Sequence, residues 1–366
     1  MKAVADGATP KRSQRDGGKF ASTSPAQKPD ALLLGVALRA ASRTTKGQTL
    51  SPLEQSLVGF LNCMAEDDVE IADYGRIFDE AKQTGDISQG IPEAILKLPD
   101  DVGYTAEDCL KDGAALLKNC DAQPNIVVAH NPNGEEAPVN VTSSDDKPTS
   151  IATFFTVPDG ESKGTAATLS PRSIRVRFNK FRCIEASGDG FFNTKDEIAW
   201  TYTSSTSRGT NRVSETREYG SVKTGTVSTF DANTILFEGE VTDRLCAHIQ
   251  CFEMDDGPAS WHDEVRQILG QVGSMLELNG NIIGLIPGLG SVADAVGLIA
   301  EICKFFATFW DDIINEHDFV AQLTLAWDRP FIDAQIKNWE YAPTNPVRFD
   351  GGGNGKHDLC FSFARM

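Results

Sequence analysis

The sequence predicts an α+β protein, in which an N-terminal helical domain is followed by an antiparallel β-sandwich with an inserted glycine-rich α-helical hairpin. Apolar residues recur at helical spacing over 31–121, and from residue 171 they alternate with polar residues, which is the period of a strand. An apolar, glycine-rich segment at 262–312 interrupts the strand pattern. Because strand patterns lie on both sides of this segment, we interpret it as an insertion within one β-domain.

The chain begins with a basic leader at residues 1–30. It contains six Lys or Arg residues and three Asp residues, which gives a net charge of +3, and it is rich in Ser, Gly and Pro. A segment of this composition buries too little apolar surface to fold alone, so we expect it to be disordered. Two interpretations remain open: an unstructured terminus, or a tag that a secretion or packaging machine recognises.

Residues 31–121 have the pattern of a small helical domain. Apolar residues on one face predict a first helix over 31–43. Ser51-Pro52 then places a capping residue before a proline, with Glu54 at the third helical position, which is typical of a helix start. Further helices are expected over these ranges: 69–84, 90–98 and 105–119.

Residues 122–170 are predicted to be a linker, because they are rich in Pro, Asn, Gly, Ser, Thr and Asp. Within the linker, Ser150–Val157 has the pattern of an isolated strand. The β-domain follows at 171–366, where short strand patterns separated by polar turns favour an antiparallel sandwich. Its expected strands are one that includes Ile174 to Phe181, then Glu197–Thr203, Val222–Phe230, Thr234–Val241, Leu245–Phe252, Phe319–Trp327 and Leu359–Arg365.

Composition and motifs exclude several classes of function. The 366-residue chain has a net charge of −18, whereas a nucleic-acid-binding protein normally presents a basic face, so nucleic acid is not an expected partner. None of the eight cysteines forms a C-x-x-C pair, which argues against a zinc site and favours reduced thiols in the core. The common hydrolase, metalloprotease, P-loop and dinucleotide-binding motifs are absent from the sequence, so we expect a non-enzymatic protein.

The N-terminus has no apolar region of the kind found in a cleavable signal peptide. We therefore expect cytoplasmic synthesis, with any export following a route that needs no signal peptide. His317 lies between two acidic residues, but one imidazole does not make a metal site. A hydrolase that uses His317, Asp311 and Asp312 is a third hypothesis, because convergent active sites need not leave a motif.

Acidic residues gather in three groups near the ends of the predicted strands. Calcium takes six to eight oxygen ligands, which flexible acidic loops at one end of a β-sandwich can supply. The residues predicted to hold calcium are Glu185, Asp189, Asp196, Glu253, Asp255, Asp256, Asp311 and Asp312. The alternative is that these residues are solvated turns and helix caps.

The layout of these acidic loops over 171–366 weakly resembles C2-type calcium modules. The resemblance rests on loop composition without a diagnostic motif, and the chain does not match the spacing of an EF-hand loop. In C2-type modules the acidic loops between strands collect calcium ions and touch lipid. The resemblance therefore implies calcium as a cofactor and a lipid membrane as a partner.

The inserted segment is apolar around most of its predicted helical circumference and breaks at Pro287-Gly288. It is expected to be buried either against its own sheet or in a membrane after a conformational change. Its longest charge-free run, Leu278–Ala293, has 16 residues, which is too short for a constitutive span of about 20. The residues predicted to face a membrane are Ile282, Ile283, Leu285, Ile286, Leu289, Val292, Val296 and Ile299.

Two functions fit these features. The first is a non-enzymatic membrane-interacting or toxin-like effector, which calcium at the sandwich loops steadies or triggers and which conceals its hairpin until it meets a membrane. The second is a structural or cargo protein of a secretion or packaging assembly, whose hairpin is only core and whose leader is a packaging tag. The expected partner is accordingly a lipid membrane or a protein assembly.

Overall fold

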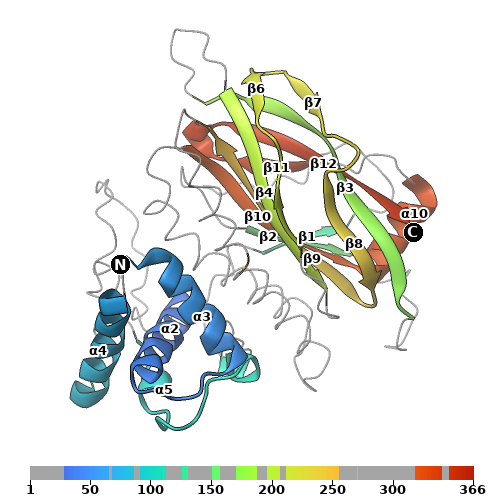
Figure 1. Ribbon diagram of the computed structural model, residues 1–366. Helices are drawn as coiled ribbons and strands as arrows, with labels where there is room; N and C mark the ends of the chain where they lie inside the picture. The colour runs from blue at the N-terminus through green and yellow to red at the C-terminus, as the bar shows by residue number, and fades with distance from the viewer. Residues whose placement is uncertain are drawn as a thin grey trace, which may run out of the picture. The chain divides into compact units, whose positions relative to one another are not determined.

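A computed structural model of the chain describes two units, Met1–Gln123 and Pro124–Met366 (Figure 1). The described residues are 29–65, 68–85, 91–109, 111–112, 126–130, 151–156, 170–187, 196–206, 212–254, 270, 318–339 and 346–366. The basic leader lies outside them up to residue 28, and the predicted hairpin at 262–312 lies outside them except for Gly270, which is helical. Within the described part of the chain, no helix has the length and apolar character needed to cross a membrane.

The first unit is helical, as the sequence predicts. Its helices are α2 (Pro29–Thr45), α3 (Pro52–Met64), α4 (Asp68–Thr84) and α5 (Glu93–Leu96). The helix expected over 90–98 is only four residues long because prolines at 92 and 99 confine it. The helix expected over 105–119 is described only as far as residue 112.

Two local features position the helices. At the start of α3, the Glu54 amide donates to the Ser51 hydroxyl over 3.1 Å, and the Ser51 amide donates to the Glu54 carboxylate over 2.9 Å, so the predicted capping box is confirmed. Between α2 and α4, a Cβ on Gly75 would lie 2.9 Å from the Ser42 Cα. Glycine at residue 75 therefore allows the two helix backbones to approach closely.

The second unit contains two sheets among the described residues, in an order that the sequence does not reveal. One sheet has seven strands: β1 (Ile126–His130), β2 (Ile151–Thr156), β10 (Asp318–Asp328), β9 (Arg244–Glu253), β4 (Asp196–Thr206) and β5 (Arg212–Glu215) in this order, with β6 (Tyr219–Val222) also paired to β4. The other has five: β11 (Val347–Asp350), β12 (Lys356–Arg365), β3 (Arg172–Glu185) and β7 (Val227–Thr229), with β8 (Ile235–Val241) also paired to β3. Most pairs are antiparallel, whereas β2 runs parallel to both β1 and β10. The chain is thus α+β, with an N-terminal helical region and two largely antiparallel sheets.

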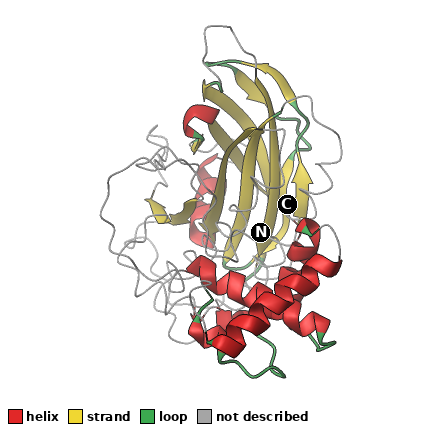
Figure 2. Cartoon of the chain, turned by 90° about the vertical axis from the view of Figure 1, so that its left-hand side faces the viewer, coloured by secondary structure: helices red, strands yellow, loops and turns green. Residues whose placement is uncertain are grey.

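Aromatic residues from both sheets meet in one hydrophobic core. The Trp200 ring of β4 lies 4.9 Å from the Phe349 ring of β11, and the Trp327 ring of β10 lies 5.4 Å from the Phe361 ring of β12, measured between centroids. Figure 2 shows the two layers of strands. Such pairs stabilise the core beyond the burial of their area.

The structure differs from the sequence prediction in three elements of the second unit. The Ser150–Val157 strand is present as β2, but it pairs with two neighbours instead of being isolated, and β1 and β2 both lie in the range expected to be a linker. The strand expected over Val222–Phe230 is split into β6 and β7, because a turn intervenes with Gly225 at a φ of +89°. An unpredicted helix, α10 (Arg329–Trp339), follows β10.

Candidate functional site

Three of the predicted calcium ligands lie at the same end of the second unit. Strand β3 ends at Glu185, β4 begins at Asp196 and β9 ends at Glu253. The Ser187 amide, just after β3, donates to the Asp196 carboxylate over 2.7 Å, and Glu253 pairs in register with Ile198, two residues into β4. We call Glu185, Asp196 and Glu253 the acidic end. The other five predicted ligands, Asp189, Asp255, Asp256, Asp311 and Asp312, lie outside the described residues, as does His317.

The three carboxylates of the acidic end have different surroundings. Asp196 and Glu253 are buried, with 2% and 8% of their surface exposed. The Glu185 side chain is 45% exposed and pairs with the Lys356 ammonium over 2.9 Å. The hydrogen bond to Glu185 is the main cause that raises the pKa of Lys356. Lys356 therefore partly neutralises the acidic end from the first residue of β12.

Hard carboxylate oxygens of this kind suit calcium, although the described residues alone do not complete a site. Among them, no three His, Cys, Asp or Glu side chains lie close enough together to hold a metal ion. A calcium ion needs six to eight oxygen ligands, so Asp196 and Glu253 would supply only part of its shell. The remaining oxygens would have to come from the neighbouring acidic segments, which follow directly in the chain.

The predicted hairpin segment is attached to the acidic end. Glu253, the last residue of β9, pairs in register with Asp318, the first residue of β10. The chain between them therefore leaves the sheet and returns to it at adjacent positions. Because Glu253 belongs to the acidic end, the base of the inserted segment lies at the acidic end.

A buried histidine lies in the core next to the acidic end, and our sequence interpretation missed it. His357 follows Lys356 in β12, has no exposed surface, and pairs in register with Cys183 of β3. Its ring packs edge-on against Phe181 and Trp200, with centroid distances of 6.0 and 6.2 Å. Neither ring nitrogen has a hydrogen-bond partner among the described residues, and burial lowers the pKa of His357 to about 4.

The alternation of β12 contained the signal for this residue. His357 is in phase with Leu359, Phe361 and Phe363, all of which are core residues. A strand that places apolar side chains inward at every second position places His357 inward as well. The sequence therefore indicated a core histidine at this position.

The opposite face of the seven-stranded sheet carries buried polar residues that link neighbouring strands. The Thr201 hydroxyl donates to Gln250 over 2.9 Å, and the Gln250 amide donates to Gln322 over 3.2 Å. Two residues away along each strand, His248 of β9 and Thr324 of β10 are hydrogen-bonded over 3.1 Å. Burial lowers the pKa of His248 to about 4. These cross-strand contacts stabilise the pairing of β4 with β9 and of β9 with β10.

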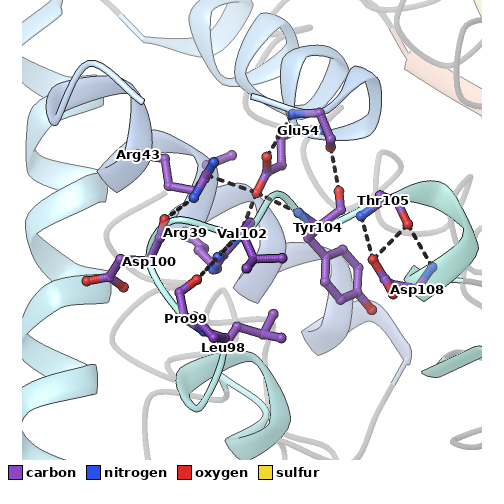
Figure 3. Close-up of polar contacts among 12 residues, drawn as sticks. Arg39, Arg43, Glu54, Leu98, Pro99, Asp100, Val102, Tyr104, Thr105 and Asp108 are labelled. Atoms are coloured by element: carbon purple, nitrogen blue, oxygen red, sulfur yellow. Dashed lines mark hydrogen bonds and ion pairs between the residues drawn. The ribbon is translucent and has the colours of Figure 1, made fainter. Parts of the chain in front are cut away.

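The first unit contains a buried ion-pair network around Glu54 (Figure 3). The Arg39 guanidinium of α2 donates to the Glu54 carboxylate over 2.7 Å, and the Tyr104 amide donates to the same oxygen over 3.1 Å. Arg39 also donates to the carbonyls of Pro99 and Val102, and Arg43 donates to the carbonyl of Asp100. Desolvation lowers the pKa of Arg39, and the charge of Glu54 opposes that effect.

This network has a structural role: it fixes the 98–104 segment against α2 and α3. Arg39 and Glu54 have no exposed surface. Arg39 contacts Glu54 and backbone carbonyls, and Glu54 contacts backbone amides, Arg39 and, over 3.4 Å, Arg43. Nothing in this arrangement leaves a charged group directed at solvent. We therefore assign no ligand to it.

Comparison with protein-family models, with curated proteins and with solved structures gave no match. The candidate site lies in the second unit. Its two distinctive features are the acidic end and the attachment of the inserted segment there.

Proposed function

We propose that the protein is a non-enzymatic membrane-interacting or toxin-like effector. In this proposal the second unit is a β-sandwich, C2-like at most, that binds calcium at the acidic end. Residues 262–312 form a concealed apolar helical hairpin that enters a membrane when it is released. The single observation that carries the proposal is the register pair of Glu253 and Asp318, which joins the base of the inserted segment to the acidic end.

Chain connectivity supports a shared calcium site at this end. Asp255 and Asp256 follow Glu253 by two and three residues, and a chain of three residues spans at most about 11 Å. Asp189 stands between Glu185 and Asp196, whose strand ends lie on the same side of the unit. These additional carboxylates are therefore tethered within reach of Asp196 and Glu253.

Because Asp196 and Glu253 are buried, a calcium ion bound to them would affect the stability of the fold. Glu253 pairs in register with Ile198, two residues from Asp196, and a divalent cation bound by both carboxylates would lower the cost of keeping their charges buried. Calcium at the acidic end would then hold the ends of β9 and β10 together. Loss of calcium, which protonation of its carboxylate ligands would also cause, would remove the ion that holds these strand ends together, at the point where the inserted segment begins and ends.

Release of a dye from lipid vesicles tests the proposal. Full-length protein is added to vesicles at pH 7 and pH 5, in the presence of EDTA or millimolar calcium. We expect release that depends on the calcium or pH condition, and we expect Asp196→Asn with Glu253→Gln to shift that dependence. The matched control, Asp101→Asn with Glu107→Gln, changes two exposed carboxylates of the first unit and should behave as the wild type. Absence of dye release in every condition would refute the proposal, whether or not the protein binds the vesicles.

The second candidate function is a structural or cargo protein of a secretion or packaging assembly. The buried polar face formed by Thr201, Gln250 and Gln322 favours it, since a sheet face with so little exposure is typical of a closed, stable fold. Deletion of residues 1–30 distinguishes the two functions. Lost loading into the assembly with an unchanged circular dichroism spectrum would favour cargo, whereas unchanged loading would argue against it.

A further inference from the structure

The outer face of β3 is basic, in a protein whose net charge is strongly negative. Strand β3 alternates between core residues such as Phe181 and outward residues that are mostly Arg or Lys. At its end nearest the acidic end, the exposed residues are Lys180 and Arg182. Exposed Lys223 belongs to the turn between β6 and β7, which is held beside β3 because the Gly225 amide donates to the Cys183 carbonyl over 2.8 Å.

The acidic residues beside this surface are already engaged by other cations. Asp358 pairs in register with Arg182, but its carboxylate accepts two hydrogen bonds from Arg348, at 2.8 and 3.0 Å. Glu185, three residues from Arg182, is bound by Lys356. Within the described part of the chain, Lys180, Arg182 and Lys223 have no ion-pair partner, so their three charges remain available to an external anion.

An exposed apolar residue stands among these cations. Val227 of β7 pairs in register with Arg182, so both side chains lie on the same face, and Val227 is 57% exposed. It is one of four large apolar residues that are exposed among the described ones. A lone exposed valine is ordinary, but cations around an apolar side chain are typical of a surface that contacts a bilayer interface.

We propose that Lys180, Arg182, Lys223 and Val227 form the surface by which the second unit binds an anionic lipid bilayer. We call these four residues the basic face. The inference rests on the proposed membrane interaction. It identifies the surface that makes the first contact and the negative lipid charge that this surface prefers. The cations would bind lipid phosphates and carboxylates, and Val227 would enter the headgroup region.

The overall charge of −18 does not prevent this contact at physiological salt. Charges farther apart than about 8 Å are largely screened at that ionic strength, so the local charge of the basic face decides the attraction. Each Lys or Arg close to an anionic bilayer strengthens partitioning about fivefold. Loss of all three cations should therefore weaken binding about 100-fold.

Co-sedimentation with vesicles tests this surface. The full chain is mixed with vesicles of phosphatidylcholine alone or with 30% phosphatidylserine, in EDTA, at about 0.1 M and about 0.5 M salt. The test variant is Lys180→Gln/Arg182→Gln/Lys223→Gln, and Val227→Asn probes the apolar contact separately. The control is Arg76→Gln/Lys97→Gln/Lys111→Gln, which removes the same number of exposed positive charges from the first unit, where Arg76 and Lys97 are engaged by neighbouring carboxylates. All changes are at exposed positions, and equal circular dichroism melting curves verify the fold.

We expect the wild type and the control to bind phosphatidylserine vesicles at low salt, and the test variant to bind about 100-fold more weakly. High salt and neutral vesicles should abolish most of the binding. Equal binding by the test variant and the wild type, or equal losses in both triple variants, would overturn the inference. So would binding of a 20-base-pair DNA duplex as tight as binding of the vesicles, because the partner would then be a general polyanion.

The same samples separate this inference from the proposed function. Vesicle binding that needs the basic face but is never followed by dye release would retain the binding surface and refute the effector. Dye release that is equal in the test variant and the wild type would refute the binding surface and retain the effector. No binding by the wild type to any vesicle would refute both.

Discussion

Acidification should destabilise the second unit through His357, and the size of the effect follows from its burial. The ordinary pKa of a histidine is 6.5, whereas burial among Phe181 and Trp200 lowers the pKa of His357 to about 4. The folded state therefore favours the neutral ring. Between pH 6.5 and pH 4 the unfolded chain takes up a proton that the folded chain does not, so stability falls as the pH falls through this window. Below pH 4 the loss is complete.

The difference between the two pKa values corresponds to about 3 kcal/mol of unfolding free energy below pH 4, and to about 2 kcal/mol at pH 5. His248 is equally buried and its pKa is lowered to the same value, so it adds a similar loss. The charge of Asp358 favours protonation of His357, but the effect of burial on the pKa is larger.

The variant His357→Leu removes one of the two titrating groups. Urea unfolding at pH 7.0, 6.0 and 5.0 should show that the variant loses about 2 kcal/mol less than the wild type between pH 7 and pH 5. Phe361→Leu, in the same strand and equally buried, is the control, because it disturbs the core without removing a titrating group. Equal losses in His357→Leu and the wild type would refute the reasoning, whatever the stability of each at pH 7.

Two further predictions concern the first unit. Arg39→Met should destabilise it by about 3 kcal/mol in urea unfolding, because the buried Glu54 would keep only its longer ion pair of 3.4 Å with Arg43. Adding Glu54→Leu to that variant should recover part of the loss, since Arg43 keeps the carbonyls of Asp100 and Thr49 as acceptors; no recovery in the double variant would contradict this. Gly75→Ala should lower the unfolding free energy by about 1–3 kcal/mol, because the new Cβ would lie 2.9 Å from the Ser42 backbone. The control is Gly353→Ala, whose Cβ would meet no atom within 4 Å, and it should leave the thermal midpoint nearly unchanged. Equal midpoints for the two alanine variants would show that α2 and α4 do not approach so closely.

Features encoded by neighbouring residues were predictable from the sequence. The Ser51 and Glu54 capping box lies within four residues and starts α3 as predicted. The alternating strands were found for the same reason, since one face of each is buried in the core. Helix α10 was missed although Asp328 stands before it as a cap, accepting a hydrogen bond from the Phe331 amide over 2.8 Å. A start signal was therefore present in the sequence.

Features that depend on strand order were not predictable. The placement of β9 between β4 and β10 brings Glu253 beside the first residues of β4, and nothing in the local sequence specifies that order. The parallel pairing of β1 and β2 joins segments separated by about twenty residues of turn-forming composition. Likewise, Glu54 forms an ion pair with Arg39 on another helix. The sequence predicted the capping role of Glu54 but not this buried ion pair.

The proposed function depends on whether Glu185, Asp196 and Glu253 belong to a calcium site. Thermal unfolding of the full chain in EDTA and then in millimolar calcium measures this. A ligand that binds only the folded state at 100 times its dissociation constant adds about 2.7 kcal/mol. For a unit of this size the midpoint should rise by about 5–10 °C, and Asp196→Asn with Glu253→Gln should abolish the rise. An unchanged midpoint in calcium would contradict a site at the acidic end.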